Sequence, residues 1–275
     1  MALLFVGKNV EKKFKPKSSS TQSSTQSEKP KPDFSKLPDL IKPNYATDIS
    51  LENKNLVITG IAAQDYYLNQ WFGKSINRPT GLEVVRQDPA NQAGAEVVSK
   101  NGEAVIKIAT DGFAMQQAKM MNQYNGGESR PHISAHEYVH VYQFQNGCGI
   151  IGMNNYLAPR WLMEGEAEWL SYKALGEAGI GPSIKFKDLY IRQAREDNTV
   201  LKSLESRQDF PPSVYPVVGM AVDYLMQDKP IKTIDDFCAK LDNGNGQSVS
   251  DAFKSAFGST LDSFYNDFEN YRKSW

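Results

Sequence analysis

Apolar and polar positions alternate with two different periods along the chain, and a strand-like region precedes a longer helical one. From residue 47 to 73 apolar side chains recur every three or four positions, which predicts a helix ending at Gly73. Short β-branched runs predict three strands, at residues 82–86, 95–99 and 104–109. Asn101-Gly102 would form the hairpin turn between the last two strands.

The helical period dominates the rest of the chain. It predicts helices at residues 130–146, 160–177, 185–207, 214–227, 233–241, 248–256 and 261–273. Residues 112–128, rich in Met, Gln, Asn and Gly, are expected to form a mobile rim ahead of the first of these helices. The pattern as a whole predicts an α+β fold, with a small sheet ahead of a helical body.

The first 45 residues differ in composition from the remainder. A lysine-rich run, a Ser/Thr/Gln stretch over residues 18–27 and Lys29-Pro30-Lys31-Pro32 offer little apolar surface to bury. We therefore expect a disordered tether over residues 1–45 and a single folded domain over 46–275, with lobes at 46–146 and 147–275. The apolar start, Met1–Gly7, is either a frayed end or the remnant of a membrane or cell-surface anchor.

Charge and cysteine content narrow the choice of partners and compartment. Net charge is −1, with Lys and Arg clustered only in the tail, so no nucleic-acid partner is expected. The longest apolar run is too short to span a membrane. Cys148 and Cys238 could form one disulfide or remain two buried thiols. We favour an extracytoplasmic or cell-surface monomer over a cytoplasmic one, because a tether would have a purpose there.

One short motif carries most of the chemical information. His136-Glu137-Tyr138-Val139-His140 places two imidazoles at i and i+4, so both share one helix face and can reach a single metal ion. Glu137 is offset by one residue and would lie beside the metal, where it can act as a general base. The motif predicts a zinc hydrolase.

The third metal ligand is not another histidine. His132 would lie about 12 Å from His140 along the helix, too far for bonds of about 2 Å to one ion. It is expected to be a polar residue at the helix start or, alternatively, a partner of a ligand. No histidine follows His140, and Gln143 and Asn146 stand where a metzincin needs Gly and His.

A carboxylate from the next helix is the strongest remaining candidate. Glu164 and Glu168 lie one turn apart among large apolar side chains, where two carboxylates without a nearby cation would be costly. Glu164 would then ligate zinc, and Glu168 would hold a histidine ring by its free N–H. Glu166 is expected to face solvent or substrate, and Cys148 is the rival third ligand.

These motifs together resemble a known family. His-Glu-x-x-His followed by Trp161-Leu162-Met163-Glu164-Gly165-Glu166-Ala167-Glu168 is similar to the gluzincins, thermolysin-like zinc peptidases of the peptidase MA clan. The likeness is strongest to small bacterial members and extends over residues 46–275. It implies a zincin-like fold, with a small mixed sheet packed on the active-site helix and a mostly helical second lobe.

The resemblance also implies roles by position. His136, His140 and Glu164 match the metal ligands, Glu137 matches the catalytic base, and Glu168 matches the acidic partner of the ligands. Tyr215, with Leu225 ten residues on, fits the tyrosine that stabilises the oxyanion, although Pro216 departs from the pattern. Residues 104–110 would be the edge strand that pairs with an extended substrate.

We therefore expect a zinc-dependent peptidase acting on a peptide or protein substrate. One alternative is a zinc amide hydrolase with a non-protein substrate such as a cell-wall peptide. The other is a non-catalytic surface-binding domain with a structural zinc. Glu137 discriminates against the last alternative, because a structural site has no need of a general base.

Overall fold

The computed structural model describes residues 32–88, 94–150, 155–181, 186–206, 210–241 and 247–275. The first 31 residues of the predicted tether lie outside this range. The described chain forms one compact unit from Pro32 to Trp275. Its architecture is mixed α+β, with a small mixed sheet and mostly helical content, as the sequence predicts.

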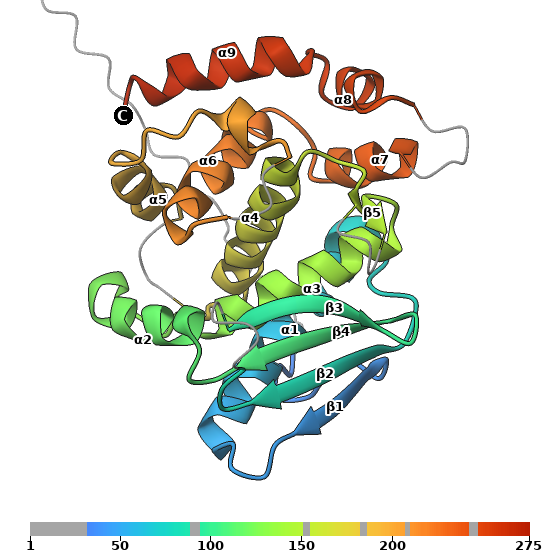
Figure 1. Ribbon diagram of the computed structural model, residues 1–275, viewed down its shortest axis with the longest axis vertical. Coiled ribbons are helices and arrows are strands. Elements are labelled where there is room, and N and C mark those ends of the chain that lie inside the picture. Colours follow the sequence, from blue (N-terminus) through green and yellow to red (C-terminus); the bar gives the residue numbers. More distant parts are fainter. Residues whose placement is uncertain (1–31, 89–93, 151–154, 182–185, 207–209, 242–246) are drawn as a thin grey trace, which may run out of the picture. The chain divides into compact units, whose positions relative to one another are not determined.

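A four-stranded sheet holds the N-terminal part together (Figure 1). Its strands are β1 (Ile41–Tyr45), β2 (Thr80–Val85), β3 (Ala95–Lys100) and β4 (Glu103–Ala109), in the order β1-β2-β4-β3. The first three in this order run parallel, and β3 is antiparallel to β4. The predicted hairpin is confirmed, because Asn101 and Gly102 have positive φ angles of 54° and 81°.

The expected end of the tail at residue 45 is wrong. Residues Ile41–Tyr45 form β1, which pairs with β2 in register from Ile41↔Thr80 to Tyr45↔Val84. Ile41 is buried in the core. The strand escaped prediction because Pro43 and the polar neighbours hide the period of two, and the parallel pairing joins residues far apart in sequence.

Removing β1 should therefore lower the thermal stability. Loss of the buried Ile41 side chain alone should cost about 2 kcal/mol, which corresponds to a Tm lower by about 4–8 °C in a chain of this size. The measurement compares the Tm of a chain beginning at Pro32 with that of a chain beginning at Ala46. Equal Tm values would show that β1 adds nothing to the fold.

The edge strands of the sheet are β1 and β3, and the expectation that residues 104–110 form the edge next to the histidine-bearing helix is wrong. Strand β4 is paired on both sides, with β2 and with β3. Within the described part of the chain, β3 pairs with β4 alone. The hairpin places β3 on the outer side of β4. Helix α3 (Pro131–Gln145), which carries the histidines, contacts both strands.

Two long helices pack together beside the sheet. Helix α1 (Leu51–Phe72) begins at Ser50, whose side chain accepts from the Asn53 backbone N–H, and ends at Gly73 in the left-handed conformation. Helix α3 (Pro131–Gln145) begins with a proline in its first turn. A Cβ on Gly60 would collide with the Pro131 carbonyl and with Ser134, so glycine allows α1 to approach the first turn of α3.

The remaining regular elements are mostly helices. They are α2 (Phe113–Asn125), α4 (Arg160–Ala178), α5 (Phe186–Ala194), α6 (Tyr215–Leu225), α7 (Lys232–Leu241), α8 (Val249–Phe257), α9 (Leu261–Arg272), two 3₁₀ turns (Leu201–Leu204, Pro212–Val214) and a two-stranded ribbon of β5 (Gly149–Ile150) and β6 (Asn155–Tyr156). Two predictions differ from this arrangement. The expected rim at 112–128 contains α2, and the expected helix at 185–207 ends at Ala194.

A disulfide joins Cys148, just after α3, to Cys238 in α7. The two residues are 90 positions apart, so the bond closes a long loop and should stabilise the fold by about 4–5 kcal/mol in the chain-entropy account. Oxidised sulfur is not available as a thiolate ligand, and Cys148 is thereby removed as the rival third ligand.

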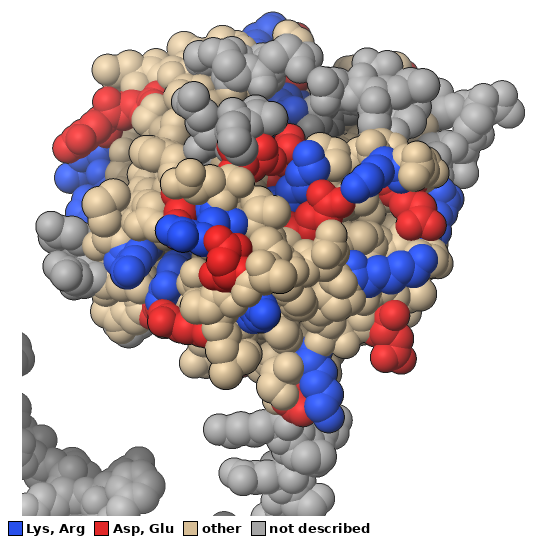
Figure 2. Space-filling view, turned by 60° about the horizontal axis from the view of Figure 1, so that its bottom comes forward, with Lys and Arg blue, Asp and Glu red and all other residues tan. Residues whose placement is uncertain are grey.

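The surface shows mixed charge on the face drawn in Figure 2, where basic and acidic side chains are interspersed. Among the helices of the described residues, none combines the length and apolar character needed to cross a membrane.

Candidate metal centre

Helices α3 and α4 bring the predicted site residues together. They pack against each other, and α4 packs in turn against α6. Gly165 makes the second contact possible, since a Cβ there would collide with the Val218 carbonyl. Glu164 and Glu168 flank this glycine and are held buried against α3. The same close packing brings the start of α6, with Tyr215, to the site.

Three donor atoms converge at the centre of the cluster. The Nε2 atoms of His136 and His140 are 3.0 Å apart, and each lies 3.3 Å from Oε2 of Glu164. All three side chains are buried. Ligands at about 2.1 Å from a tetrahedral zinc ion would lie about 3.4 Å from each other. The spacing therefore fits a single zinc ion held by these three residues.

The fourth predicted residue, Glu168, contacts both upstream histidines. Its Oε1 lies 3.0 Å from Nδ1 of His136, and its Oε2 lies 3.3 Å from Nε2 of His132. Tyr190 donates its hydroxyl to the same carboxylate. Burial alone would raise the pKa of Glu168, but His132 and His136 hold it below its usual range. This anionic carboxylate fixes the ring of His136.

His132 lies in the first turn of α3, as expected of a polar residue at the helix start. It is buried, lies against Glu168 and stacks on Tyr172 with ring centroids 4.0 Å apart. Helix α4 covers this end of α3 through Tyr172. The alternative interpretation, a residue that contacts a ligand's partner, fits the structure.

Arg160 holds the other oxygen of Glu164. Its guanidinium Nη2 lies 2.7 Å from Oε1 of Glu164, one turn away on α4. Burial alone would raise the pKa of Glu164, but the His140 and His136 imidazoles and Arg160 hold it well below its usual range. Glu164 is therefore anionic and presents only Oε2 to the histidines. The i, i+4 spacing from Arg160 was the available sequence signal for this contact.

His140 is held by a residue that sequence reasoning passed over. Nδ1 of His140 lies 2.8 Å from Oε1 of Gln143, and Nε2 of Gln143 donates to Oε2 of Glu166 at 2.9 Å. Glu166 is fully buried, which makes its expected contact with solvent or substrate wrong. Burial raises the pKa of Glu166 to about 8, and the hydrogen bond from Gln143 offsets this only in part.

These contacts decide which nitrogen of each ring is free. The carboxylate of Glu168 needs a proton on Nδ1 of His136, and the amide oxygen of Gln143 needs one on Nδ1 of His140. Both Nε2 lone pairs then point at each other and at Oε2 of Glu164. Three electron-rich atoms at 3.0–3.3 Å require a proton or a cation between them.

Glu137 lies next to this cluster, at the wall of a cavity. The cavity has a volume of about 570 Å³ and is lined by His136 and Glu137. Burial raises the pKa of Glu137, and the nearby His136 and His140 only partly counteract this. A carboxylate with a raised pKa is a better proton acceptor for catalysis near neutral pH.

The rest of the cavity wall is mainly apolar. It comes from β3, α2, α3, α4, α5, α6 and the segment just before α6, and includes Ala95, Phe113, Met121, Ile133, Phe210 and Pro216. A side chain of a bound molecule could be held there by apolar contact, and Ala95 places the sheet edge at the same cavity.

Tyr215 is the first residue of α6 and lines the cavity. Its ring lies edge-on to His136, with centroids 5.8 Å apart, and edge-on to Phe210. Pro216 is accommodated in the first helical turn, where a missing N–H costs nothing. Burial and the nearby carboxylates raise the pKa of Tyr215, so its hydroxyl stays protonated and can donate.

Comparison with known proteins adds evidence on the fold. No protein-family model and no curated protein matches the sequence. Three chains of known structure match. One is the crystal structure of a mutant M1 zinc metallopeptidase from Deinococcus radiodurans, with a TM-score of 0.50 and 14% sequence identity. The fold is similar to that of a zinc metallopeptidase.

The match covers 83% of this chain and 48% of the other, so the chain spans about half the length of that metallopeptidase. At this identity the similarity concerns the fold alone. It supports the arrangement of a small mixed sheet and a helical body.

Proposed function

We propose that this chain is a zinc-dependent peptidase. The observation that carries the proposal is the convergence of two Nε2 lone pairs and the anionic Glu164 at 3.0–3.3 Å, beside a buried carboxylate that opens onto a cavity. His136, His140 and Glu164 would hold the metal. Bound there, zinc would act as a Lewis acid and lower the pKa of a water molecule toward about 7.

The residues around this position would transfer the proton, stabilise the oxyanion and orient the substrate. Glu137 takes the proton of the attacking water and returns it to the leaving nitrogen, with its raised pKa suited to both steps. Tyr215 donates a hydrogen bond to the developing oxyanion. The β3 edge and the apolar wall of the cavity orient an extended peptide by backbone pairing and side-chain burial.

A combined metal and digestion experiment tests the proposal. Purified protein should contain one zinc per chain and cleave casein or members of a peptide library. A chelator should abolish cleavage, and added zinc should restore it. A protein that binds zinc but cleaves neither would support the structural-zinc alternative. Cleavage that survives complete zinc removal would exclude the proposed mechanism.

Tyr215→Phe should reduce the rate without loss of zinc. The substitution keeps the ring packed against His136 and Phe210 and removes only the hydroxyl. Loss of one oxyanion donor should lower kcat by about 10²–10³-fold. The measurement is kcat with zinc content and Tm as controls. Near-normal kcat would assign the oxyanion to another donor. Tyr190, which lines the cavity but donates to Glu168, is then the next residue to test.

A further inference from the structure

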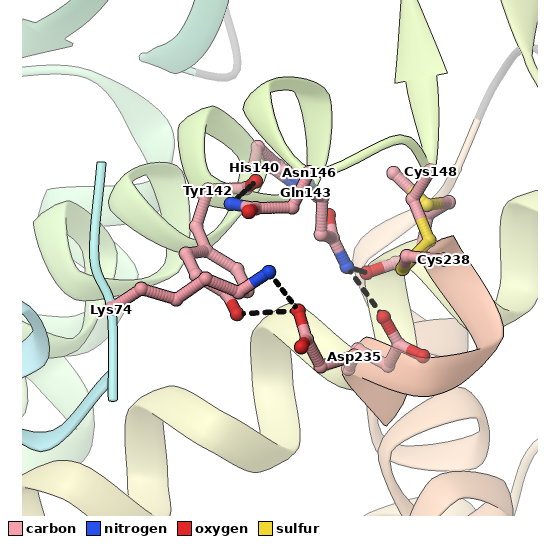
Figure 3. The surroundings of a disulfide bond; sticks show 10 residues. Lys74, His140, Tyr142, Gln143, Asn146, Cys148, Asp235 and Cys238 are labelled. Carbon is pink, nitrogen blue, oxygen red and sulfur yellow. Dashed lines mark hydrogen bonds and ion pairs between the residues drawn. A yellow bond between two sulfur atoms is a disulfide. The ribbon is translucent and has the colours of Figure 1, made fainter. Parts of the chain in front are cut away.

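A chain of hydrogen bonds leads away from the metal centre to a buried carboxylate. It runs from Nδ1 of His140 to Oε1 of Gln143, and from Nε2 of Gln143 to Oε2 of Glu166. The amide nitrogen of Gln143 also donates to the Met163 carbonyl at 2.9 Å. Figure 3 shows His140 and Gln143 on α3 close to the Cys148–Cys238 disulfide.

The two acceptors determine which way the Gln143 amide faces. The Met163 carbonyl can only accept a hydrogen bond, so it attracts the NH₂ group of Gln143, and Oε2 of Glu166 accepts from the same group. The amide oxygen of Gln143 then faces His140 and can accept a hydrogen bond only if Nδ1 of His140 carries a proton. A reversed amide would present N–H to Nδ1, place the proton on Nε2 and block that nitrogen from binding a metal.

Glu166 is poorly explained by stability alone. It is fully buried, its Oε1 has no hydrogen-bond partner among the described residues, and a carboxylate oxygen lies within 4.8 Å of both disulfide sulfurs. In the part of the chain that the structure describes, no lysine or arginine offsets the effect of burial on the pKa of Glu166, whereas Asp235 binds Lys74 and the Tyr142 hydroxyl (Figure 3). A buried acid of this kind costs free energy relative to an apolar side chain of similar size.

We infer that Glu166 is a positioning residue, which acts through Gln143 to keep Nε2 of His140 free for the metal. The inference rests on the metal site proposed above. It explains why a carboxylate is placed where it weakens the fold: partners of metal-binding histidines set the tautomer and orientation of the ring. Glu166 touches neither substrate nor metal in this arrangement.

The test uses Glu166→Met, which fills the same space without an acceptor. Zinc dissociation into excess chelator should become about 10–100-fold faster, the range for lost outer partners of metal ligands. The visible spectrum of the cobalt-substituted protein should change as well. The Tm should be unchanged or higher, because an unpaired buried acid is removed. Glu166→Gln retains an acceptor for Gln143, so its zinc release should stay nearly as slow as that of the wild type.

A double-mutant cycle tests whether Glu166 acts through Gln143. Gln143→Met should also speed zinc release, and the double variant should release zinc no faster than Gln143→Met alone. Asp235→Asn is the matched control. It alters another buried carboxylate near the same disulfide, bound to Tyr142 and Lys74, and should lower the Tm with zinc release and the cobalt spectrum unchanged.

The outcomes separate this inference from the proposed function. The inference would be overturned if the wild type binds zinc and Glu166→Met leaves both the rate of zinc release and the cobalt spectrum unchanged. The peptidase proposal would remain intact in that case. Equally fast release from Asp235→Asn would overturn it too, because general loosening would then explain the effect. Wild-type protein that binds no zinc would overturn both.

Discussion

Glu137→Gln should abolish most hydrolysis and leave the metal in place. The amide is nearly isosteric with the carboxylate but cannot take a proton from water, and loss of a general base costs about 10²–10⁴-fold in rate. Glu137 is not among the three residues whose donor atoms converge, so the zinc content should stay at one per chain. Casein or peptide cleavage is measured together with zinc content.

Fold and metal content are the controls for this variant. The Tm should not fall, because Glu137 is a buried carboxylate whose pKa burial raises, and a neutral amide avoids that cost. Turnover equal to that of the wild type would show that Glu137 is not the base. The peptidase mechanism would fail with it.

Glu164→Gln should empty the metal site. The amide keeps an acceptor for Arg160 but removes the negative charge that two imidazoles face at 3.3 Å. Outer partners of metal ligands are worth about 10–100-fold in affinity, so loss of a ligand should weaken zinc binding by more than about 100-fold. Competition with a chelator of known affinity measures the change, and hydrolysis should fall with occupancy.

The matched control is Glu177→Gln on the same helix. Glu177 pairs with Lys173 at the surface, and its replacement should leave the zinc affinity unchanged. Glu166 is unsuitable as a control, because it contacts Gln143 and through it His140. Full occupancy in Glu164→Gln would show that another group completes the site.

Local periodicity predicted most of the regular structure. The helix over 130–146 corresponds to α3, and the hairpin around Asn101-Gly102 joins β3 and β4. Both depend on residues near in sequence, whose spacing the chain displays directly. The strand β1 and the helix α2 were missed, since neither carries a clear apolar period and each is stabilised by contacts with distant segments.

The helical spacing also placed two imidazoles on one face, and the structure brings His136 and His140 together with Glu164. Their roles as ligands remain proposals. Sequence reasoning misjudged one neighbour. Glu166 is a polar residue in a helix, for which exposure is the usual expectation, yet it is fully buried.

The sequence by itself determined the chemistry available at one face of one helix, because i, i+4 geometry follows from the backbone alone. It also determined which carboxylates could join that face. The tertiary structure decided how those groups are held. Glycine contacts at positions 60 and 165 set the distances between helices, and the packing of α4 on α3 places Glu168 at Nδ1 of His136 and Glu166 at the amide of Gln143. Such contacts join residues across helices, and only the packing of side chains in the folded chain specifies them.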